Sequence, residues 1–372
     1  MKRILFFTPF GGRSGSEMLL WNIIKQLDPA RYEAVMYADQ VGAMKTDLPA
    51  HVPFHTSPYN EGFLSRTVSK VASAAGFLAY ERRILALHAR YKPDFWYINT
   101  IMMAHVASLV KRVGVRVIAH VHEMPYVLYE PVNKNELQQM LTAELVLSSS
   151  TSACQSLAIM GATSPKVLHP GIDFSPIKPA PARVARLRQQ YQIPANAFIW
   201  GLSGSLIYRK GIDYLPQLAS LMKQAGRSCY FVWMGGGSDN AAEYYMRCEL
   251  AHYGHTNVLF TGALNETYYD HMALIDAFLL PSHEETFGMV NIEAAYLGKP
   301  IIAFNSGGVT DIMTEGMGKV VTSWNVADFA AAMLDLMDGR ISVDPAISRK
   351  RALDFSLENL YAQWDAYVSD LG

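Results

Sequence analysis

Short apolar segments alternate with amphipathic helical segments along this chain, and no other feature of the sequence constrains the fold as much. Residues 4–7 have the composition of a buried strand, and residues 18–27 have the apolar spacing of a helix. Further strand-like segments are 95–98, 115–121 and 145–147. Strands that alternate with helices form parallel sheets covered by helices on both faces. We therefore predict an α/β protein.

The alternation is interrupted once, where prolines and alanines gather. Pro176, Pro179 and Pro181 lie between Ser175 and Ala182. Beyond them the pattern restarts, with strand-like segments at 198–202, 230–234, 258–260, 277–280 and 300–304. A chain of 372 residues also has the length of two α/β domains of roughly 150 to 200 residues each. The sequence predicts two doubly wound Rossmann-like domains, residues 1–178 and 179–354.

Composition and charge narrow the class of protein. Half of the residues are hydrophobic and 17% are charged, which is typical of a packed globular chain. The net charge of −1 gives no overall attraction for nucleic acid, so we expect no nucleic-acid partner. The three cysteines have no metal-ligand spacing, and no secretory signal is recognised. We expect a cytoplasmic protein that does not span a membrane.

In open parallel sheets, ligands bind beyond the carboxyl ends of strands, so the loops that follow strands are the candidate sites. The most informative loop begins at Pro281 and continues into a helix that stops near Gly298. Glu285 lies before this helix and Glu293 lies inside it. Between the two, the backbone N–H groups of Phe287, Gly288 and Met289 form a candidate anion site at the helix start. Two solvated glutamates near a helix start are the alternative.

Two carboxylates on either side of a phosphate site suit a ligand with hydroxyls at both ends and phosphates in the middle. A nucleotide sugar has this form, with ribose at one end and hexose at the other. The loop from Gly204 to Gly211 adds two cations, Arg209 and Lys210, which are suited to a diphosphate leaving group. A basic pair on a surface turn is the alternative.

Two further loops belong to the first half of the chain. The loop from Gly11 to Glu17 contains Gly15 and permits a close approach of backbone to phosphate, although its spacing is not that of the dinucleotide fingerprint. His120 and His122 lie on the same face at the end of a strand. No third or fourth zinc ligand lies nearby in sequence, so we predict no metal site.

Together these segments resemble glycosyltransferase family 4, whose members are retaining enzymes with the GT-B fold of two Rossmann-like domains. The strongest match is the pair Glu285 and Glu293, separated by seven residues. Supporting matches are Gly15 with Glu17, His122 with Glu123, the segment 170–173, and Arg209-Lys210-Gly211. The motifs follow the family's order over nearly the whole chain. The resemblance also implies that the last helix, within 355–372, completes the N-terminal domain.

The resemblance implies a role for each matched residue. Glu285 would contact the transferred sugar, Glu293 the ribose, and Lys210 with Arg209 the diphosphate. The backbone of Gly15, Gly288 and Met289 would face the phosphates, and His122 would lie by the donor sugar. Glu285, His122 and Lys210 are thus the predicted catalytic residues, and no cofactor or metal is expected.

One departure from the family bears on the donor site. Ser205 stands where many members have arginine, so either Arg209 supplies the second cation or phosphate binding is weaker. The implied function is transfer of a hexose-type sugar from a UDP- or GDP-sugar to a glycan or lipid-linked acceptor, in polysaccharide or glycolipid synthesis. The alternative is a catalytically inactive, sugar-nucleotide-binding partner protein of the same fold.

The segment 61–93 suggests a membrane surface as an additional partner. It has six basic side chains against two acidic ones, Glu61 and Glu81; the basic ones are Arg66, Lys70, Arg82, Arg83, Arg90 and Lys92. Phe63, Phe77, Leu78, Tyr80 and Leu85 lie among them. A basic amphipathic helix can lie on an anionic bilayer, which suits an enzyme peripheral to the inner face of a membrane. The alternative is a surface helix that packs its apolar face on its own domain.

Overall fold

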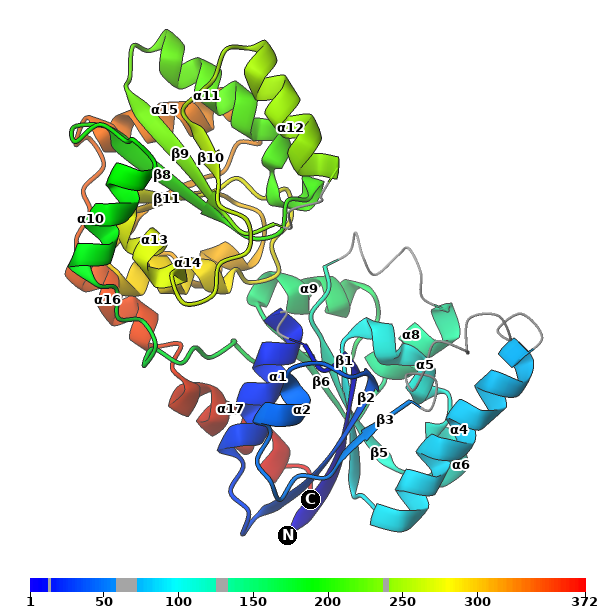
Figure 1. Ribbon diagram of the computed structural model, residues 1–372. Coiled ribbons are helices and arrows are strands. Elements are labelled where there is room, and N and C mark those ends of the chain that lie inside the picture. The colour runs from blue at the N-terminus through cyan, green and yellow to red at the C-terminus, as the bar shows by residue number, and fades with distance from the viewer. Residues whose placement is uncertain (13–14, 58–71, 125–132, 237–240) are drawn as a thin grey trace. The chain divides into compact units, whose positions relative to one another are not determined.

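The computed structural model describes residues 1–12, 15–57, 72–124, 133–236 and 241–372, and the chain forms two compact units (Figure 1). The first unit is Met1–Gly171 with Leu357–Gly372, and the second is Ile172–Ser356. The division therefore lies at residue 171, not at residue 178. The proline segment belongs to the second unit, because Ile172 is bridged to Ser356 and the Ala180 N–H donates to Asp270 Oδ1 at 2.8 Å.

The first unit is built on a parallel sheet of seven strands in the order β3-β2-β1-β4-β5-β6-β7. Its strands are β1 Lys2–Phe10, β2 Tyr32–Gln40, β3 Phe54–Thr56, β4 Phe95–Asn99, β5 Arg116–Val121, β6 Leu145–Ser148 and β7 Lys166–Val167. Leu5 and Phe7 of β1 pack into one core, whereas Ile4 and Phe6 pack into another. Since successive side chains of a strand point to opposite faces, both faces of this sheet are buried.

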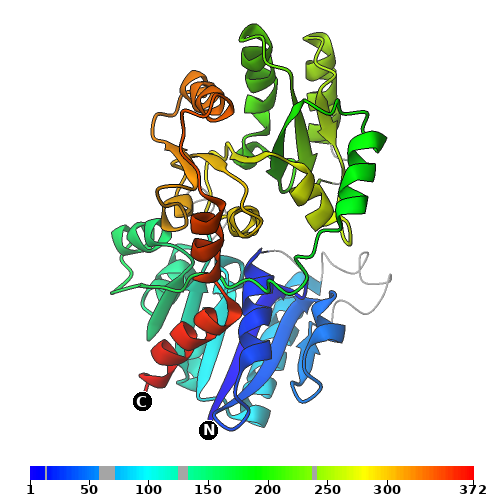
Figure 2. The same cartoon turned by 90° about the vertical axis from the view of Figure 1, so that its left-hand side faces the viewer.

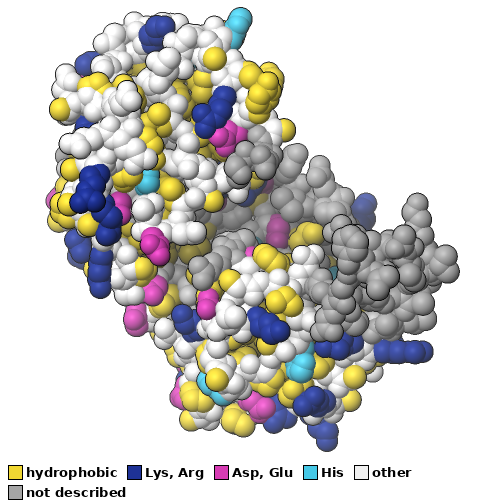
Figure 3. All heavy atoms as spheres, in the orientation of Figure 1, with side chains coloured by type: hydrophobic (Ala, Val, Ile, Leu, Met, Phe, Trp, Pro, Cys, Tyr) yellow, Lys and Arg dark blue, Asp and Glu magenta, His cyan; other side chains and the backbone are white. Residues whose placement is uncertain are grey.

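The helices that cover this sheet follow the strands in the chain. Their bounds are α1 Gly15–Gln26, α2 Met44–Asp47, α4 Ala72–Tyr91, α5 Ala104–Ala107, α6 Val110–Val113, α8 Lys134–Leu141, α9 Thr151–Ile159 and α17 Leu357–Ser369. On the face shown in Figure 3, Lys and Arg side chains lie in the region of α4 and α6. Arg82 and Arg90 of α4 and Arg112 of α6 are exposed.

The last helix, α17, belongs to the first unit and lies beside α1 (Figure 2). Its Leu360, Trp364 and Val368 are buried at helical spacing. The Trp364 ring meets the Tyr32 ring edge-on at 5.1 Å, and Tyr32 donates to Asp365 Oδ1 at 2.6 Å. Apolar burial and a hydrogen bond thus tie the end of the chain to the first unit.

The second unit repeats the design with a parallel sheet of six strands in the order β10-β9-β8-β11-β12-β13. Its strands are β8 Phe198–Ser203, β9 Cys229–Met234, β10 Val258–Phe260, β11 Ala277–Leu280, β12 Ile301–Phe304 and β13 Gly318–Val321. Its helices are α10 Pro181–Gln190, α11 Leu215–Gln224, α12 Ala241–His252, α13 Tyr268–Leu274, α14 Met289–Tyr296, α15 Val326–Met337 and α16 Pro345–Leu353. Phe278 and Leu280 of β11 enter one core, and Ala277 and Leu279 enter the other.

Both sheets reverse their strand order once, between β1 and β4 in the first and between β8 and β11 in the second. This is the topology of a doubly wound fold, in which ligands bind at the reversal. In the second unit, the loops at the reversal are the two singled out in the sequence, those after β8 and β11. Among the described residues, no helix is long and apolar enough to cross a membrane.

Candidate functional site

The loop after β8 is shaped by glycines at close backbone contacts. Gly204 has φ 135° and Gly211 has φ 75°, both in the left-handed region that favours glycine. A Cβ on Gly211 would lie 2.1 Å from the Pro281 carbonyl oxygen, so this loop and the loop after β11 touch. The loop thereby delivers Arg209 and Lys210, at the end of a 3-10 turn over Tyr208–Lys210, to the side of Glu285.

Lys210 and Glu285 form the central ion pair of the second unit. Lys210 Nζ donates to Glu285 Oε2 at 2.5 Å, and the Ser282 hydroxyl lies 3.4 Å from the same oxygen. Glu285 is only 5% exposed. Its backbone is fixed because its N–H donates to Ser306 O at 2.8 Å and its carbonyl accepts from Gly308 N at 2.9 Å. The carboxylate is thus held in one place, with Lys210 as its cation.

Arg209 is held differently from Lys210. Its guanidinium donates from Nη1 to the Glu284 carbonyl oxygen at 3.1 Å, and its own carbonyl accepts from His283 N at 2.9 Å. Ser205 is exposed at the same loop. The structure therefore places one predicted cation, Lys210, in an ion pair with Glu285 and the other, Arg209, against the backbone of the loop after β11.

Helix α14 begins at Met289, and Gly288 precedes it with φ 86° and no side-chain cap. Phe287 is 3% exposed and packs against Phe355 with ring centroids 5.4 Å apart, so its side chain belongs to the core. Phe287 can therefore offer a ligand only its backbone groups, and these lie with those of Gly288 and Met289 at the N-terminus of α14.

Asn291 is a residue that the sequence reasoning missed. It is fully buried, and neither atom of its side-chain amide has a hydrogen-bond partner among the described residues. A Cβ on Gly288 would lie 2.5 Å from Asn291 Nδ2 and 3.1 Å from Glu285 Cγ, so the amide lies beside both. The signal was available, since Asn291 is a polar residue on the buried side of a short apolar helix between the two glutamates.

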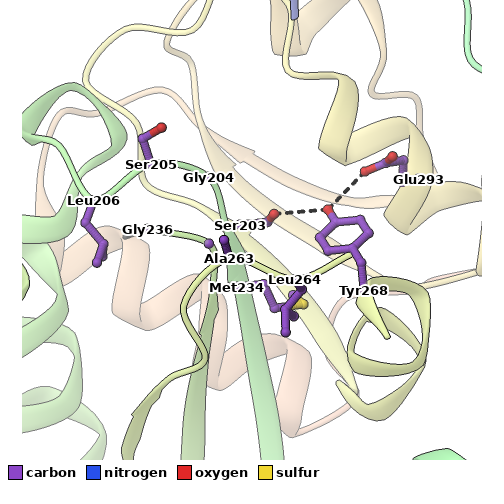
Figure 4. Close-up of a pocket in the computed structure, with 11 residues that line it drawn as sticks. Ser203, Gly204, Ser205, Leu206, Met234, Gly236, Ala263, Leu264, Tyr268 and Glu293 are labelled. Atoms are coloured by element: carbon purple, nitrogen blue, oxygen red, sulfur yellow. Dashed lines mark hydrogen bonds between the residues drawn. The ribbon is translucent and has the colours of Figure 1, made fainter. Parts of the chain in front are cut away.

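Glu293 is the fifth residue of α14 and lies among tyrosine hydroxyls. Tyr268 donates to Oε2 at 3.0 Å and Tyr269 donates to Oε1 at 3.1 Å. The Tyr268 hydroxyl also lies 3.0 Å from Ser203 Oγ (Figure 4). Burial raises the pKa of Glu293 to about 7, although the two tyrosine bonds act to lower it. Burial also raises the pKa of both tyrosines, so they stay protonated and donate.

A cavity of about 650 Å³ opens at the carboxyl ends of β8 and β9 (Figure 4). Its walls combine glycine backbone, small apolar side chains, two serines, a tyrosine and a glutamate. The lining residues are Ser203, Gly204, Ser205, Leu206, Met234, Gly235, Gly236, Ala263, Leu264, Tyr268 and Glu293. Lys210 lies next to Gly204 of this wall, because a Cβ on Gly204 would be 3.5 Å from Lys210 Cε. A cavity of this size with few polar groups is typical of a small-molecule site.

In the first unit, His122 lies just beyond β5 with both ring nitrogens engaged. Nε2 lies 2.7 Å from Asn99 Oδ1, and Nδ1 lies 3.0 Å from Ser149 Oγ. Burial lowers its pKa to about 3, so the imidazole is neutral at physiological pH and donates from Nε2 to Asn99. The backbone N–H of His122 donates to Glu123 Oε2 at 3.0 Å.

Gly15 is the exposed first residue of α1, and a Cβ there would meet nothing within 4 Å.

The other histidine of this strand, His120, is fully buried and its Nδ1 lies 2.6 Å from the Tyr97 hydroxyl. The rings of His120 and His122 lie 4.0 Å apart. Within residues 1–12, 15–57, 72–124, 133–236 and 241–372, no group of three His, Cys, Asp or Glu side chains is arranged to hold a metal ion.

Comparison with known proteins shows which proteins this chain is similar to. Residues 184–352 match the family model described as glycosyl transferases group 1. The chain is 29% identical over 300 residues to a GDP-mannose-dependent α-(1-6)-phosphatidylinositol monomannoside mannosyltransferase of Mycobacterium tuberculosis, covering 76% of this chain and 74% of that protein. It is also 31% identical over 183 residues to a 2-deoxystreptamine glucosyltransferase of Streptomyces kanamyceticus, covering 48% and 46% of the two chains.

Among solved structures, HepE of Anabaena in complex with UDP-glucose superposes with a TM-score of 0.80 and 22% identity over 100% of both chains. At this identity the likeness establishes the fold, and the predicted fold class, α/β with two Rossmann-like domains of GT-B type, is confirmed. The family model and the curated relatives are glycosyltransferases, so the chain is similar to that class of enzyme across both units.

Proposed function

We propose that this chain is a retaining, metal-independent glycosyltransferase of family 4. It transfers a hexose-type sugar from a UDP- or GDP-sugar to a glycan or lipid-linked acceptor, in the synthesis of polysaccharide or glycolipid. The observation that carries the proposal is the position of the Lys210–Glu285 ion pair next to the cavity that Glu293 lines. The two glutamates flank the start of α14, and Lys210 joins Glu285 to the Gly204 part of the cavity wall.

Each group has a role in this reaction. Glu293 accepts hydrogen bonds from the ribose, and Lys210 with the N-terminus of α14 stabilises the diphosphate as its charge grows on bond cleavage. Glu285 contacts the hexose. Arg209 and Ser205 lie in the same phosphate-facing loop, and Phe287, Gly288 and Met289 contribute backbone N–H groups. The roles of Gly15 toward the phosphates and of His122 toward the donor sugar rest on the family resemblance.

The curated relatives support the choice of donor and acceptor. The mycobacterial relative is named as GDP-mannose-dependent and acts on a phosphatidylinositol mannoside, and the solved structure of HepE holds UDP-glucose. Thermal shift with UDP, GDP, ADP and their sugars identifies the donor, because a ligand at about 100 times its Kd stabilises by roughly 2.7 kcal/mol. With the donor known, proton NMR of the product's anomeric signal tests retention. An inverted product contradicts the family placement.

A second candidate is an inactive nucleotide-sugar-binding partner of the same fold. Two observations favour it. Position 205 is serine and not arginine, and Arg209 Nη1 already donates a hydrogen bond to the Glu284 carbonyl oxygen. The two candidates differ in turnover. An enzyme hydrolyses its donor slowly without acceptor, whereas the partner protein binds the donor and releases it unchanged. Release of free sugar from the preferred donor, measured against a Glu285→Gln control, decides between them.

A further inference from the structure

Two consecutive tyrosines at the start of α13 each bond a different oxygen of Glu293. The Tyr268 hydroxyl lies 3.0 Å from Oε2, and the Tyr269 hydroxyl lies 3.1 Å from Oε1. Tyr268 is fixed in turn by Ser203, whose Oγ lies 3.0 Å from its hydroxyl. The carboxylate is thereby held at both ends, and its orientation is determined by α13 and β8 as well as by its own helix.

This arrangement leaves the carboxylate with unused acceptor capacity. An ionised carboxylate has about four lone-pair sites, two on each oxygen. The tyrosines occupy one site on each oxygen, so one site on each remains. Glu293 and Tyr268 both line the cavity (Figure 4), so a ligand in the cavity lies beside this carboxylate. Two adjacent acceptors match two hydroxyls on neighbouring carbons, which is a vicinal diol.

We propose that Tyr268 and Tyr269 are positioning residues that fix Glu293 as a paired acceptor for the vicinal diol of a ribonucleoside, and that they thereby set selectivity against 2′-deoxyribonucleotides. The inference rests on the proposed function, since it takes a nucleotide as the ligand of this cavity. It adds a specificity role for two residues that lie outside the matched motif.

The tyrosines also act on the charge of Glu293. The groups that face its carboxylate are Tyr268 and Tyr269 from α13. The negative charge of Asp173, in the segment before α10, helps to raise the pKa of Tyr269. Burial raises the pKa of Glu293, and the tyrosine hydrogen bonds oppose that rise. Tyr→Phe substitution therefore leaves the carboxylate less well oriented and protonated up to a higher pH.

The test uses the full chain and the probes UDP, GDP, 2′-deoxy-UDP and 2′-deoxy-GDP, with Kd measured by calorimetry. The variants are Tyr268→Phe, Tyr269→Phe and the double substitution. Tyr191→Phe is the matched control. The Tyr191 hydroxyl is hydrogen-bonded to another residue of α13, His271, at 2.9 Å from its Nε2, and not to Glu293. Thermal unfolding verifies that each variant is folded.

For the preferred base, we expect wild type to bind the ribonucleotide at least about tenfold more tightly than its 2′-deoxy form. The 2′-deoxy form lacks one hydrogen bond to the charged Glu293, and the loss of such a bond has an effect of about this size. The ratio should fall severalfold in each single variant and further in the double variant, while Tyr191→Phe keeps the wild-type ratio. Equal weakening of both nucleotides, with the ratio unchanged, overturns the inference.

The pH dependence provides a readout that a purely structural role does not move. Ribonucleotide affinity should rise as the pH increases through about 7, where Glu293 ionises, and the double variant should shift this rise to higher pH. Titration of the nucleotide phosphate is common to all variants and cancels in the comparison. An unchanged midpoint contradicts the inference. If wild type binds neither UDP nor GDP, the proposed function itself fails.

Discussion

Lys210 Nζ lies 2.5 Å from Glu285 Oε2, and this ion pair joins two loops whose residues are 75 positions apart in the chain. The pair forms because β8 and β11 are neighbours in the sheet, so that the loops after them meet. The two side chains are 16% and 7% exposed, which removes most of the solvent that would screen them. In the proposed reaction, the bond that breaks links the hexose to the diphosphate. The groups assigned to those two parts of the donor are thus in direct contact.

Lys210→Met should destabilise the protein because it leaves the Glu285 carboxylate buried without its cation. Breaking a buried ion pair by removal of one partner costs about 3 to 5 kcal/mol, and the slight exposure of Lys210 places the loss near the lower value. Urea unfolding monitored by tryptophan fluorescence measures it. The double variant Lys210→Met/Glu285→Gln should recover most of the stability but no activity. Failure of the second substitution to restore stability contradicts the coupling.

Glu285→Gln and Glu293→Gln should impair the enzyme in different ways. A ribose contact is made about equally in the ground and transition states, so loss of the Glu293 charge should mainly raise the KM for the donor. A contact at the reacting sugar should lower kcat more, so Glu285→Gln should act mainly on kcat. Steady-state kinetics with the donor varied separates the two effects. Identical profiles for the two variants rule out this assignment of roles.

Turnover should survive an excess of EDTA. Lys210, Arg209 and the N-terminus of α14 are the groups proposed to stabilise the diphosphate, so no divalent ion is required for that task. Donor turnover is measured before and after chelation, and again after addition of Mn²⁺. Activity that disappears with the chelator and returns with Mn²⁺ shows that the phosphate chemistry is assigned to the wrong groups.

The strands buried on both faces were the easiest elements to predict from the sequence. Residues 4–7, 95–98 and 277–280 are continuous apolar runs, and all three lie in central strands, β1, β4 and β11. The strand β2 was missed, because Glu33 and Asp39 interrupt its apolar residues. The edge strands β3, β7 and β13 were also missed, since two to four residues carry little pattern. The edge strand β10, whose three residues are all apolar, was predicted, so a continuous apolar run decides whether a strand is recognised more than its place in the sheet does.

The candidate site shows the same limit in another form. Glu285, Lys210 and Glu293 were identifiable because each occurs in a local motif. The bonds of Tyr268 and Tyr269 to Glu293 were not, because they join residues 25 and 24 positions apart on two different helices. The pairing of His122 with Asn99 across β4 and β5 is likewise a consequence of sheet register, in which Asn99 lies opposite His120. Such contacts depend on tertiary packing, which a single sequence does not encode locally.

The ionisation of Glu293 should make stability depend on pH. Its pKa rises from an ordinary 4.5 to about 7 in the folded protein. The folded state then binds the proton more tightly, so this group contributes stability fully below pH 4.5 and loses that contribution as the pH rises through 7, by roughly 3 kcal/mol in all. The free energy of unfolding of wild type, minus that of Glu293→Gln, should therefore decrease from pH 5 to pH 8. A constant difference contradicts the raised pKa.

The basic surface of the first unit provides a prediction about the acceptor side. Glu61, Phe63, Arg66 and Lys70 lie outside the described residues, as do the side chains of Phe77 and Leu78. In the described part of α4, Tyr80 packs against the core of its own unit, and Ile84 and Leu87 are buried in that core. These apolar residues therefore face the protein. Arg82, Arg90 and Lys92 are exposed, Arg83 is half-buried, and Arg112 is paired with Glu81.

Attraction to a membrane through this described part should consequently be electrostatic, at about 1 kcal/mol for each cation near an anionic surface. We expect the protein to co-sediment with phosphatidylglycerol vesicles at low salt and to dissociate as salt screens the charges, since the Debye length falls to about 8 Å at physiological ionic strength. Arg82→Glu/Arg83→Glu should weaken binding. The matched control is Lys178→Glu/Arg186→Glu, which reverses two exposed cations of the second unit and should leave binding unchanged. If wild type fails to bind these vesicles even at low salt, or if both double variants lose binding equally, α4 is not a membrane-facing surface and the acceptor is reached from solution.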